Sequence, residues 1–174
     1  MRKAARKLYG IFGTSGMTEI MPSHKFGFES ACPLLFVRVG GKTLNKELIH
    51  AVLVETQAGK LIFPEVVRRL LDAGVESYFC DLAGGVETVY MRDGATLIEK
   101  ISLPLAPIAE EFSRDGVVAA IRGAQTDTIR YPEFVRRSTA AGVIAYWAFL
   151  TGRRVVYFGR KGEMHVEEFP GAKT

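Results

Sequence analysis

The sequence predicts an α+β fold made of two copies of an α-α-β-β-β unit, with antiparallel meanders packed by helices. The main observation is internal: residues 61–99, moved forward by 68 positions, fall without a gap on residues 129–167. Identical residues occupy 14 of these 39 aligned positions, whereas unrelated segments would share about one in twenty. Matched helix boundaries and matched glycine turns support the same repeat.

Helix signals occur at the same offset in both copies. The first predicted helix spans residues 45–56, and its counterpart spans residues 113–125 and begins at Ser113, whose hydroxyl can cap it. A second, shorter helix begins in each copy at a proline, which suits the first helical position because it lacks an N–H group. Each of these short helices ends at a glycine that can adopt the left-handed conformation, Gly74 or Gly142.

Three strands follow in each copy and are joined by glycine-containing turns. Because one meander with two short helices buries little surface, we expect the two copies to pack together. The predicted strands are residues 75–82, 86–91 and 95–101 in the first copy, and residues 143–150, 154–158 and 163–169 in the second.

The first strand of each copy differs in polarity. Residues 143–150 are apolar on both faces of the strand, whereas residues 75–82 include Glu76, Ser77 and Asp81. This difference predicts that the strand of the second copy lies centrally and that of the first copy lies nearer solvent. Trp147 and Phe149 alternate with Tyr146, and we expect helices to pack on the face that carries Trp147 and Phe149.

The repeat sets the domain boundaries. Residues 43–174 are predicted to form a single duplicated domain, with repeat 1 at residues 44–101, a proline-containing linker at 102–112 and repeat 2 at 113–169. Residues 1–42 show neither helical nor strand periodicity. They are interpreted as a poorly ordered basic arm, or as an extension from a misplaced start codon.

Charge and composition exclude several classes of function. The net charge of +4 arises at the N-terminus, because residues 1–46 hold eight Lys or Arg against two Glu, whereas residues 47–174 hold 15 basic and 17 acidic residues. A nucleic-acid role is therefore disfavoured and rests only on the basic arm. No apolar run approaches the ~20 residues that cross a bilayer, so we expect no membrane partner. The two cysteines show no disulfide or zinc spacing, which favours a cytoplasmic protein. The histidines show no ligand spacing and no nucleotide- or phosphate-binding glycine motif occurs, so we expect neither a metal nor another cofactor.

Several short motifs together resemble a known family. They are Phe-Pro-Glu-x-x-x-Arg at residues 63–69, Ala-Gly-Val-x-x-Tyr at residues 73–78, and the ending from residue 152 through residue 167. In this order they resemble the YbcV-like bacterial family of unknown function, whose members are sometimes labelled phage envelope protein. The resemblance covers about residues 48–172. It implies a small bacterial α+β domain, phage-related in origin, and it offers no catalytic residues.

The short helices carry charged pairs at a spacing of four residues, Glu65 with Arg69 and Glu133 with Arg137. Such pairs are typical of a solvated helix face, where each contributes a few tenths of a kcal/mol. In the alternative, the arginines at 68, 69, 136 and 137 converge on an anionic ligand.

Four residues are the candidates for a ligand site: Tyr146, Arg160, His165 and Glu167. Tyr146 lies in the first strand of repeat 2 and is expected in the core, with a possible second role in lining a pocket between the copies. His165 and Glu167 share one face of the last strand, where a histidine beside a carboxylate can perform acid–base chemistry. An exposed polar pair explains the same spacing without any ligand.

Two classes of function therefore stay open. The first is a non-catalytic binding or regulatory domain that acts on an unknown small ligand or protein partner through the inter-repeat surface, with a homo-oligomer also possible. The second is a small enzyme acting on an anionic small molecule at a cleft near His165. An enzyme predicts a closed cleft that holds His165, whereas a binding domain predicts an exposed His165.

Overall fold

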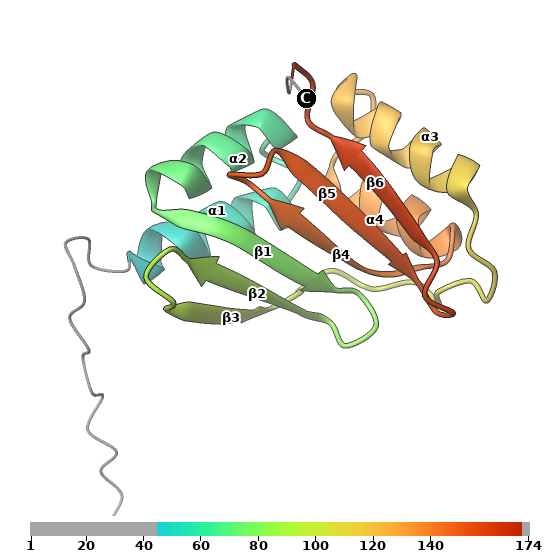
Figure 1. Ribbon diagram of the computed structural model, residues 1–174, viewed down its shortest axis with the longest axis horizontal. Coiled ribbons are helices and arrows are strands. Elements are labelled where there is room, and N and C mark those ends of the chain that lie inside the picture. Colours follow the sequence, from blue (N-terminus) through green and yellow to red (C-terminus); the bar gives the residue numbers. More distant parts are fainter. Residues whose placement is uncertain (1–44, 172–174) are drawn as a thin grey trace, which may run out of the picture. The chain divides into compact units, whose positions relative to one another are not determined.

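The computed structural model describes residues 45–171, which form one six-stranded antiparallel sheet with four helices (Figure 1). The prediction of an α+β fold is confirmed. The first half contains α1 (Lys46–Gln57), α2 (Phe63–Asp72), β1 (Val75–Asp81), β2 (Val86–Met91) and β3 (Thr96–Lys100). The second half contains α3 (Arg114–Gln125), α4 (Tyr131–Ala140), β4 (Val143–Phe149), β5 (Arg154–Gly159) and β6 (Met164–Glu168).

The two halves have the same order of elements and the same element lengths. Each element of the second half begins 68 residues after its counterpart, as with α1 at Lys46 and α3 at Arg114. The predictions that fall on residues 1–42 lie outside the described residues, as do positions 43 and 44. Among residues 45–171, no helix combines the length and the apolar character needed to span a bilayer.

The sheet order is β3-β2-β1-β4-β5-β6, so the halves meet where β1 pairs with β4. At the middle of this pairing Phe79 lies opposite Trp147, the residue 68 positions later. A local pseudo-twofold axis therefore passes between these two residues. The prediction that β1 lies nearer solvent than β4 is wrong, because both strands are central. The polar residues Glu76 and Asp81 lie toward the two ends of β1, and the Asp81 carboxylate accepts a hydrogen bond from Gly84 N in the following turn.

The helices begin within one residue of the predicted positions, and the short helices start one residue before the proline rather than at it. Ser113 caps α3 by accepting a hydrogen bond from Gly116 N, and Asn45 caps α1 in the same way. Both short helices contain a proline in their first turn. Gly74 and Gly142 follow α2 and α4 with φ of +87° and +83°, values that strain any residue with a Cβ.

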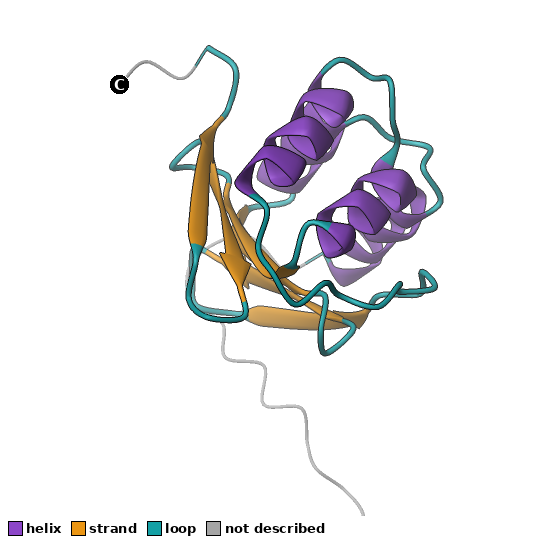
Figure 2. Ribbon diagram, turned by 90° about the vertical axis from the view of Figure 1, so that its right-hand side faces the viewer, coloured by secondary structure: helices purple, strands orange, loops and turns teal. Residues whose placement is uncertain are grey.

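All four helices cover one face of the sheet, and no helix within residues 45–171 lies on the other, the bare face (Figure 2). The core lies between the layers and includes Tyr78 and Tyr146, which are 5% and 3% exposed. The prediction that helices pack against Trp147 and Phe149 is therefore wrong. Tyr146 lies on the helix-covered face instead, where its hydroxyl is 2.9 Å from the Tyr131 hydroxyl of α4. Trp147 and Phe149 stack on each other on the bare face.

Candidate functional site: a tyrosine-lined cavity with a buried glutamate

A cavity of about 80 Å³ lies between the helix layer and the sheet. Side chains from both halves line it, so it belongs to the interface between them. Its inner wall comes from core-facing positions of the four central strands, and its apolar roof comes from all four helices. The lining includes Tyr78, Glu87, Tyr146, Val155 and Tyr157 from the strands, and Leu53, Val66, Ile121, Tyr131 and Phe134 from the helices.

Tyrosines form the inner wall. Tyr78 and Tyr146 occupy equivalent positions in the two halves, and their rings meet edge to face with centroids 6.2 Å apart. The Tyr146 hydroxyl shares a hydrogen bond with Tyr131, whose hydroxyl also lies 3.5 Å from Cys80 Sγ. The central part of the cavity therefore combines aromatic faces with a short chain of polar atoms.

Glu87 is the one carboxylate held deep in this wall by the strands. It is 4% exposed, and its side chain has no hydrogen bond or ion pair among residues 45–171. Burial raises the pKa of Glu87 to about 8, and the nearby carboxylate of Glu99 contributes to the rise. At neutral pH the carboxyl is therefore mostly protonated and uncharged.

The tyrosines and the cysteine are held in their protonated forms as well. Burial raises the pKa of Tyr78, Tyr131 and Tyr146 well above 10.0, and the Glu87 charge adds to each rise. Burial likewise raises the pKa of the Cys80 thiol far above its usual 9.0. A thiol in this state is a poor nucleophile, because the thiolate is the reactive form. These groups can donate hydrogen bonds to a bound molecule.

The rim of the cavity is polar and mainly acidic. Exposed Asp127, Arg130 and Glu168 lie there, and Arg130 Nη1 pairs with Asp127 Oδ1 at 2.6 Å. The more buried Glu167 accepts hydrogen bonds from Gln125 Nε2 at 3.0 Å and from Arg122 Nη1 at 3.2 Å.

The structure brings together only part of the predicted site. Tyr146 and Glu167 both line the cavity. His165 is 6% exposed, so the expectation of an exposed polar pair is wrong, and so is the exposed His165 expected of a binding domain. Its ring lies beside the site, with its centroid 6.2 Å from that of Tyr157, but it does not line the cavity, as an enzyme cleft near His165 would require. Its Nε2 approaches Glu167 Oε2 to 3.5 Å, yet the geometry does not make a hydrogen bond. Arg160 lies exposed in the turn after β5, outside the lining.

Glu87 was not among the residues selected from the sequence, although a signal was available. Glu87 alternates with Val89 and Met91 in β2, which places its side chain on the core face with those two residues. In the second half the equivalent position is occupied by buried Val155. A carboxylate at a position where the other copy has a core valine is an unusual substitution, and it points to a buried acid.

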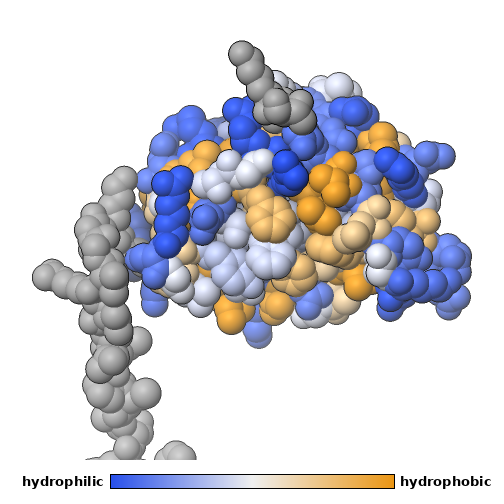
Figure 3. Space-filling model, in the orientation of Figure 1, coloured by the Kyte–Doolittle hydropathy of each residue, from blue (hydrophilic) through white to orange (hydrophobic). Residues whose placement is uncertain are grey.

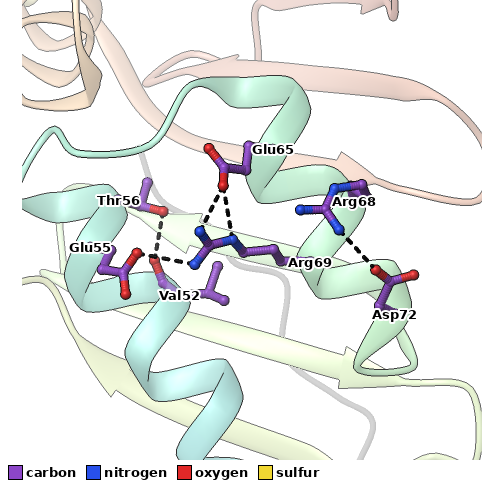
Figure 4. A network of polar contacts seen from close by, with 7 residues as sticks. All are labelled: Val52, Glu55, Thr56, Glu65, Arg68, Arg69 and Asp72. Carbon is purple, nitrogen blue, oxygen red and sulfur yellow. Dashed lines mark hydrogen bonds and ion pairs between the residues drawn. The ribbon is translucent and has the colours of Figure 1, made fainter.

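The arginines of the short helices are each engaged by carboxylates. Arg69 lies between Glu65 and Glu55, with contacts of 2.6 and 3.1 Å, and so joins α2 to α1 (Figure 4). In α4, Glu133 holds both Arg136 and Arg137. This arrangement fits the solvated-face interpretation, and the four arginines do not converge on one point.

The bare face of the sheet is a second candidate surface. Phe79, Trp147 and Phe149 cluster near its centre, with Tyr90 beside Trp147. Apolar and aromatic side chains gather over this face, with hydrophilic ones toward its margins (Figure 3). Toward its edges lie further exposed apolar residues, namely Ile98, Met164 and Val166.

Comparison with known proteins adds no relative: no protein-family model matches the chain, and no curated protein matches it. Among residues 45–171, no group of three or more His, Cys, Asp or Glu side chains is arranged to hold a metal ion.

Proposed function

We propose that this chain is a non-catalytic binding domain that holds a small organic ligand in the cavity between its helices and its sheet. Glu87 is the observation that carries this proposal. An enclosed carboxyl costs free energy to charge, which is why burial raises the pKa of Glu87, and a ligand that pairs with the carboxylate would offset that cost. The mostly apolar lining with a few polar groups is typical of small-molecule sites.

An enzyme acting on an anionic molecule near His165 has less support. His165 lies outside the cavity lining, and the one guanidinium in that lining, Arg130, already pairs with Asp127, so the lining offers no free cation to an anion. The buried cysteine of the sheet, Cys80, does not line the cavity and is held as a thiol. The YbcV-like resemblance also remains a proposal, and it would add no activity to this account.

We also infer that the two halves arose by tandem duplication of one α-α-β-β-β unit. The constant offset of 68 residues and the pairing of Phe79 with Trp147 on a local axis support this origin. The cavity would then have arisen at the interface of the two copies. Glu87, where the second copy has Val155, would place a carboxyl in its wall.

Filling the cavity tests the ligand-binding proposal. Ala124 of α3 lines the cavity, whereas Ala119 of the same helix is exposed. A fragment library should give binders by protein-observed NMR, with shifts around Tyr146 and Glu87. Ala124→Met should abolish these shifts and the matched Ala119→Met should retain them. Shifts that persist in the Ala124→Met variant, or a library that yields no binder, would contradict the proposal.

The bare sheet face supports a second function, self-association. Antiparallel sheets with one packed face usually carry polar residues on the other, but here the centre of that face is aromatic. Six strands of five to seven residues cover on the order of 600 Å² at the usual strand spacing, so two such faces reach the ~1,000 Å² of a specific interface.

A second copy of the chain is the occupant that the geometry of this face favours. The pseudo-twofold axis through Phe79 and Trp147 makes the face resemble itself after a half turn, as an isologous interface requires. Light scattering of the full chain should give a dimer, and Trp147→Ser should give a folded monomer. A monomeric full chain would contradict self-association, and a dimer that forms only after deletion of residues 1–44 would instead show that this segment covers the face.

A further inference from the structure

The charge of the cavity lining narrows the class of ligand. Four carboxylates line the cavity, those of Glu87, Asp127, Glu167 and Glu168, against the single guanidinium of Arg130. Arg130 is already paired with Asp127, so it is not free to bind an anion. Glu167 and Glu168 each pair with an arginine from outside the lining, which leaves Glu87 as the carboxyl that a positively charged ligand would meet.

The surroundings of Glu87 also favour a positively charged ligand. It is 4% exposed, faces the cavity and has no polar partner within the part of the chain that the structure describes. The rings of Tyr78, Tyr131 and Tyr146 line the same cavity. Aromatic faces attract an organic cation by about 0.5 to 2 kcal/mol each, and most strongly where water is excluded.

A metal ion fits this site less well than an organic cation. Divalent ions such as Ca²⁺ and Mg²⁺ take about six oxygen ligands, and no metal-holding group of three or more acidic, histidine or cysteine side chains occurs within residues 45–171. Apolar residues supply most of the remaining lining, for example Leu53, Phe134 and Val155. The ligand should therefore combine one charged group with an apolar body.

We infer that the cavity binds a small organic monocation, a primary or secondary amine with an apolar body, whose ammonium group pairs with the Glu87 carboxylate. This inference rests on the proposed binding function. In the free protein the Glu87 carboxyl carries a proton near neutral pH. Binding of the ammonium ion releases that proton to solvent, so one positive charge replaces another beside Glu87.

The cavity volume sets the size of the ligand. A volume of about 80 Å³ is about half of the ~150 Å³ that encloses one benzene molecule. A ligand with one aromatic ring would therefore place only its ammonium end and part of its ring inside, with the rest at the polar rim. Benzylamine is a suitable probe, because benzyl alcohol is its neutral analogue and benzoate its anionic one.

Proton release makes the affinity depend on pH. The titratable groups nearest Glu87 are Tyr78, Cys80, Tyr131 and Tyr146, which stay protonated below pH 9, and Glu99, which pairs with His50 at 3.2 Å. Between pH 6 and pH 7 the dissociation constant of benzylamine should fall about tenfold, because the proton is displaced from a carboxyl that is protonated in this range.

Calorimetry of the full-length chain tests the inference. At pH 7.5 benzylamine should bind at least tenfold more tightly than benzyl alcohol, and benzoate should not bind. Glu87→Gln should weaken benzylamine at least tenfold and remove the pH dependence, while the exposed control Glu76→Gln should change neither. Thermal unfolding of each variant confirms that it is folded.

The outcomes separate two failures. The inference of a cationic ligand would be wrong, while the binding function would still hold, in either of two cases. In the first, benzyl alcohol or benzoate binds as tightly as benzylamine. In the second, the dissociation constant of benzylamine changes neither with pH nor in Glu87→Gln. If none of the probes bound and the fragment library also gave no binder, the binding function itself would fail.

Discussion

Replacing Glu87 with glutamine should make the stability of the fold respond differently to pH. The pKa of Glu87 is about 8 in the folded protein and 4.5 in a solvated chain. Because the folded pKa is the higher one, the unfolded chain binds fewer protons between these values, and the stability contributed by this residue falls as pH rises from 4.5 to 8. Below pH 4.5 the carboxyl is protonated in both states and the effect is absent.

The magnitude follows from the two pKa values. At 1.36 kcal/mol for each pKa unit, the full difference from 4.5 to about 8 amounts to about 5 kcal/mol above pH 8. The part that develops between pH 5 and pH 7 is roughly 2 to 3 kcal/mol. A glutamine side chain does not titrate, so the stability of the Glu87→Gln variant relative to the natural protein should rise by this amount over the same interval.

Urea unfolding followed by the fluorescence of the one tryptophan, Trp147, measures this difference. For an m-value of about 1 to 3 kcal/mol/M, the midpoint of Glu87→Gln relative to the natural protein should move by about 1 to 3 M between pH 5 and pH 7. Glu76→Gln, at an exposed position, should track the natural protein. If the midpoints of Glu87→Gln and the natural protein stayed a constant distance apart across this range, Glu87 would not be a buried acid.

Three further substitutions test the fold around the site, each by urea unfolding. Gly142→Ala should lower the free energy of unfolding by about 3 kcal/mol, because φ is positive there and the added Cβ would clash with a backbone carbonyl. Gly162→Ala has a similar φ but open space around it, and should cost about 1 kcal/mol. Equal costs for the two variants would refute the close contact. Ser113→Ala should cost about 1 kcal/mol through loss of the α3 cap, and no change would show that the cap is dispensable. Tyr146→Phe should cost about 1 to 2 kcal/mol by breaking the buried hydroxyl pair, more than Tyr157→Phe, and the reverse order would contradict the polar chain.

Much of the fold could be predicted because its signals are local. A serine cap, a proline in a first helical turn and a glycine at a helix end each act within a few residues, and the element boundaries they set recur 68 positions apart. The element order and most boundaries followed from these signals. The position of β1 could not be predicted from its own polarity, because strand order depends on pairing between segments far apart in the chain.

The face of β4 that receives the helices was assigned wrongly for a related reason. Tyr146 and Trp147 are both large and aromatic, so the alternation pattern separates the two faces without saying which one is covered. The covered face is the one that contacts α4, as the hydrogen bond between the Tyr131 and Tyr146 hydroxyls shows. The aromatic residues on the uncovered face then become a surface feature that alternation alone does not reveal.

The candidate site was predicted only in part. Tyr146 and Glu167 were selected for their strand positions, and both line the cavity. Glu87 was passed over because a single glutamate in a strand resembles a solvated residue. Its chemistry depends on a roof of helices supplied by both halves, and that environment exists only after folding.

The titration of the Glu87 carboxyl carbon, followed by NMR in the full chain, tests the central claim most directly. We predict a midpoint near pH 8 in the free protein, and a lower midpoint when the cavity is saturated with benzylamine, because the ammonium ion favours the charged carboxylate. A midpoint near the ordinary value of 4.5, unchanged by the amine, would show that Glu87 is solvated and would contradict the proposed site.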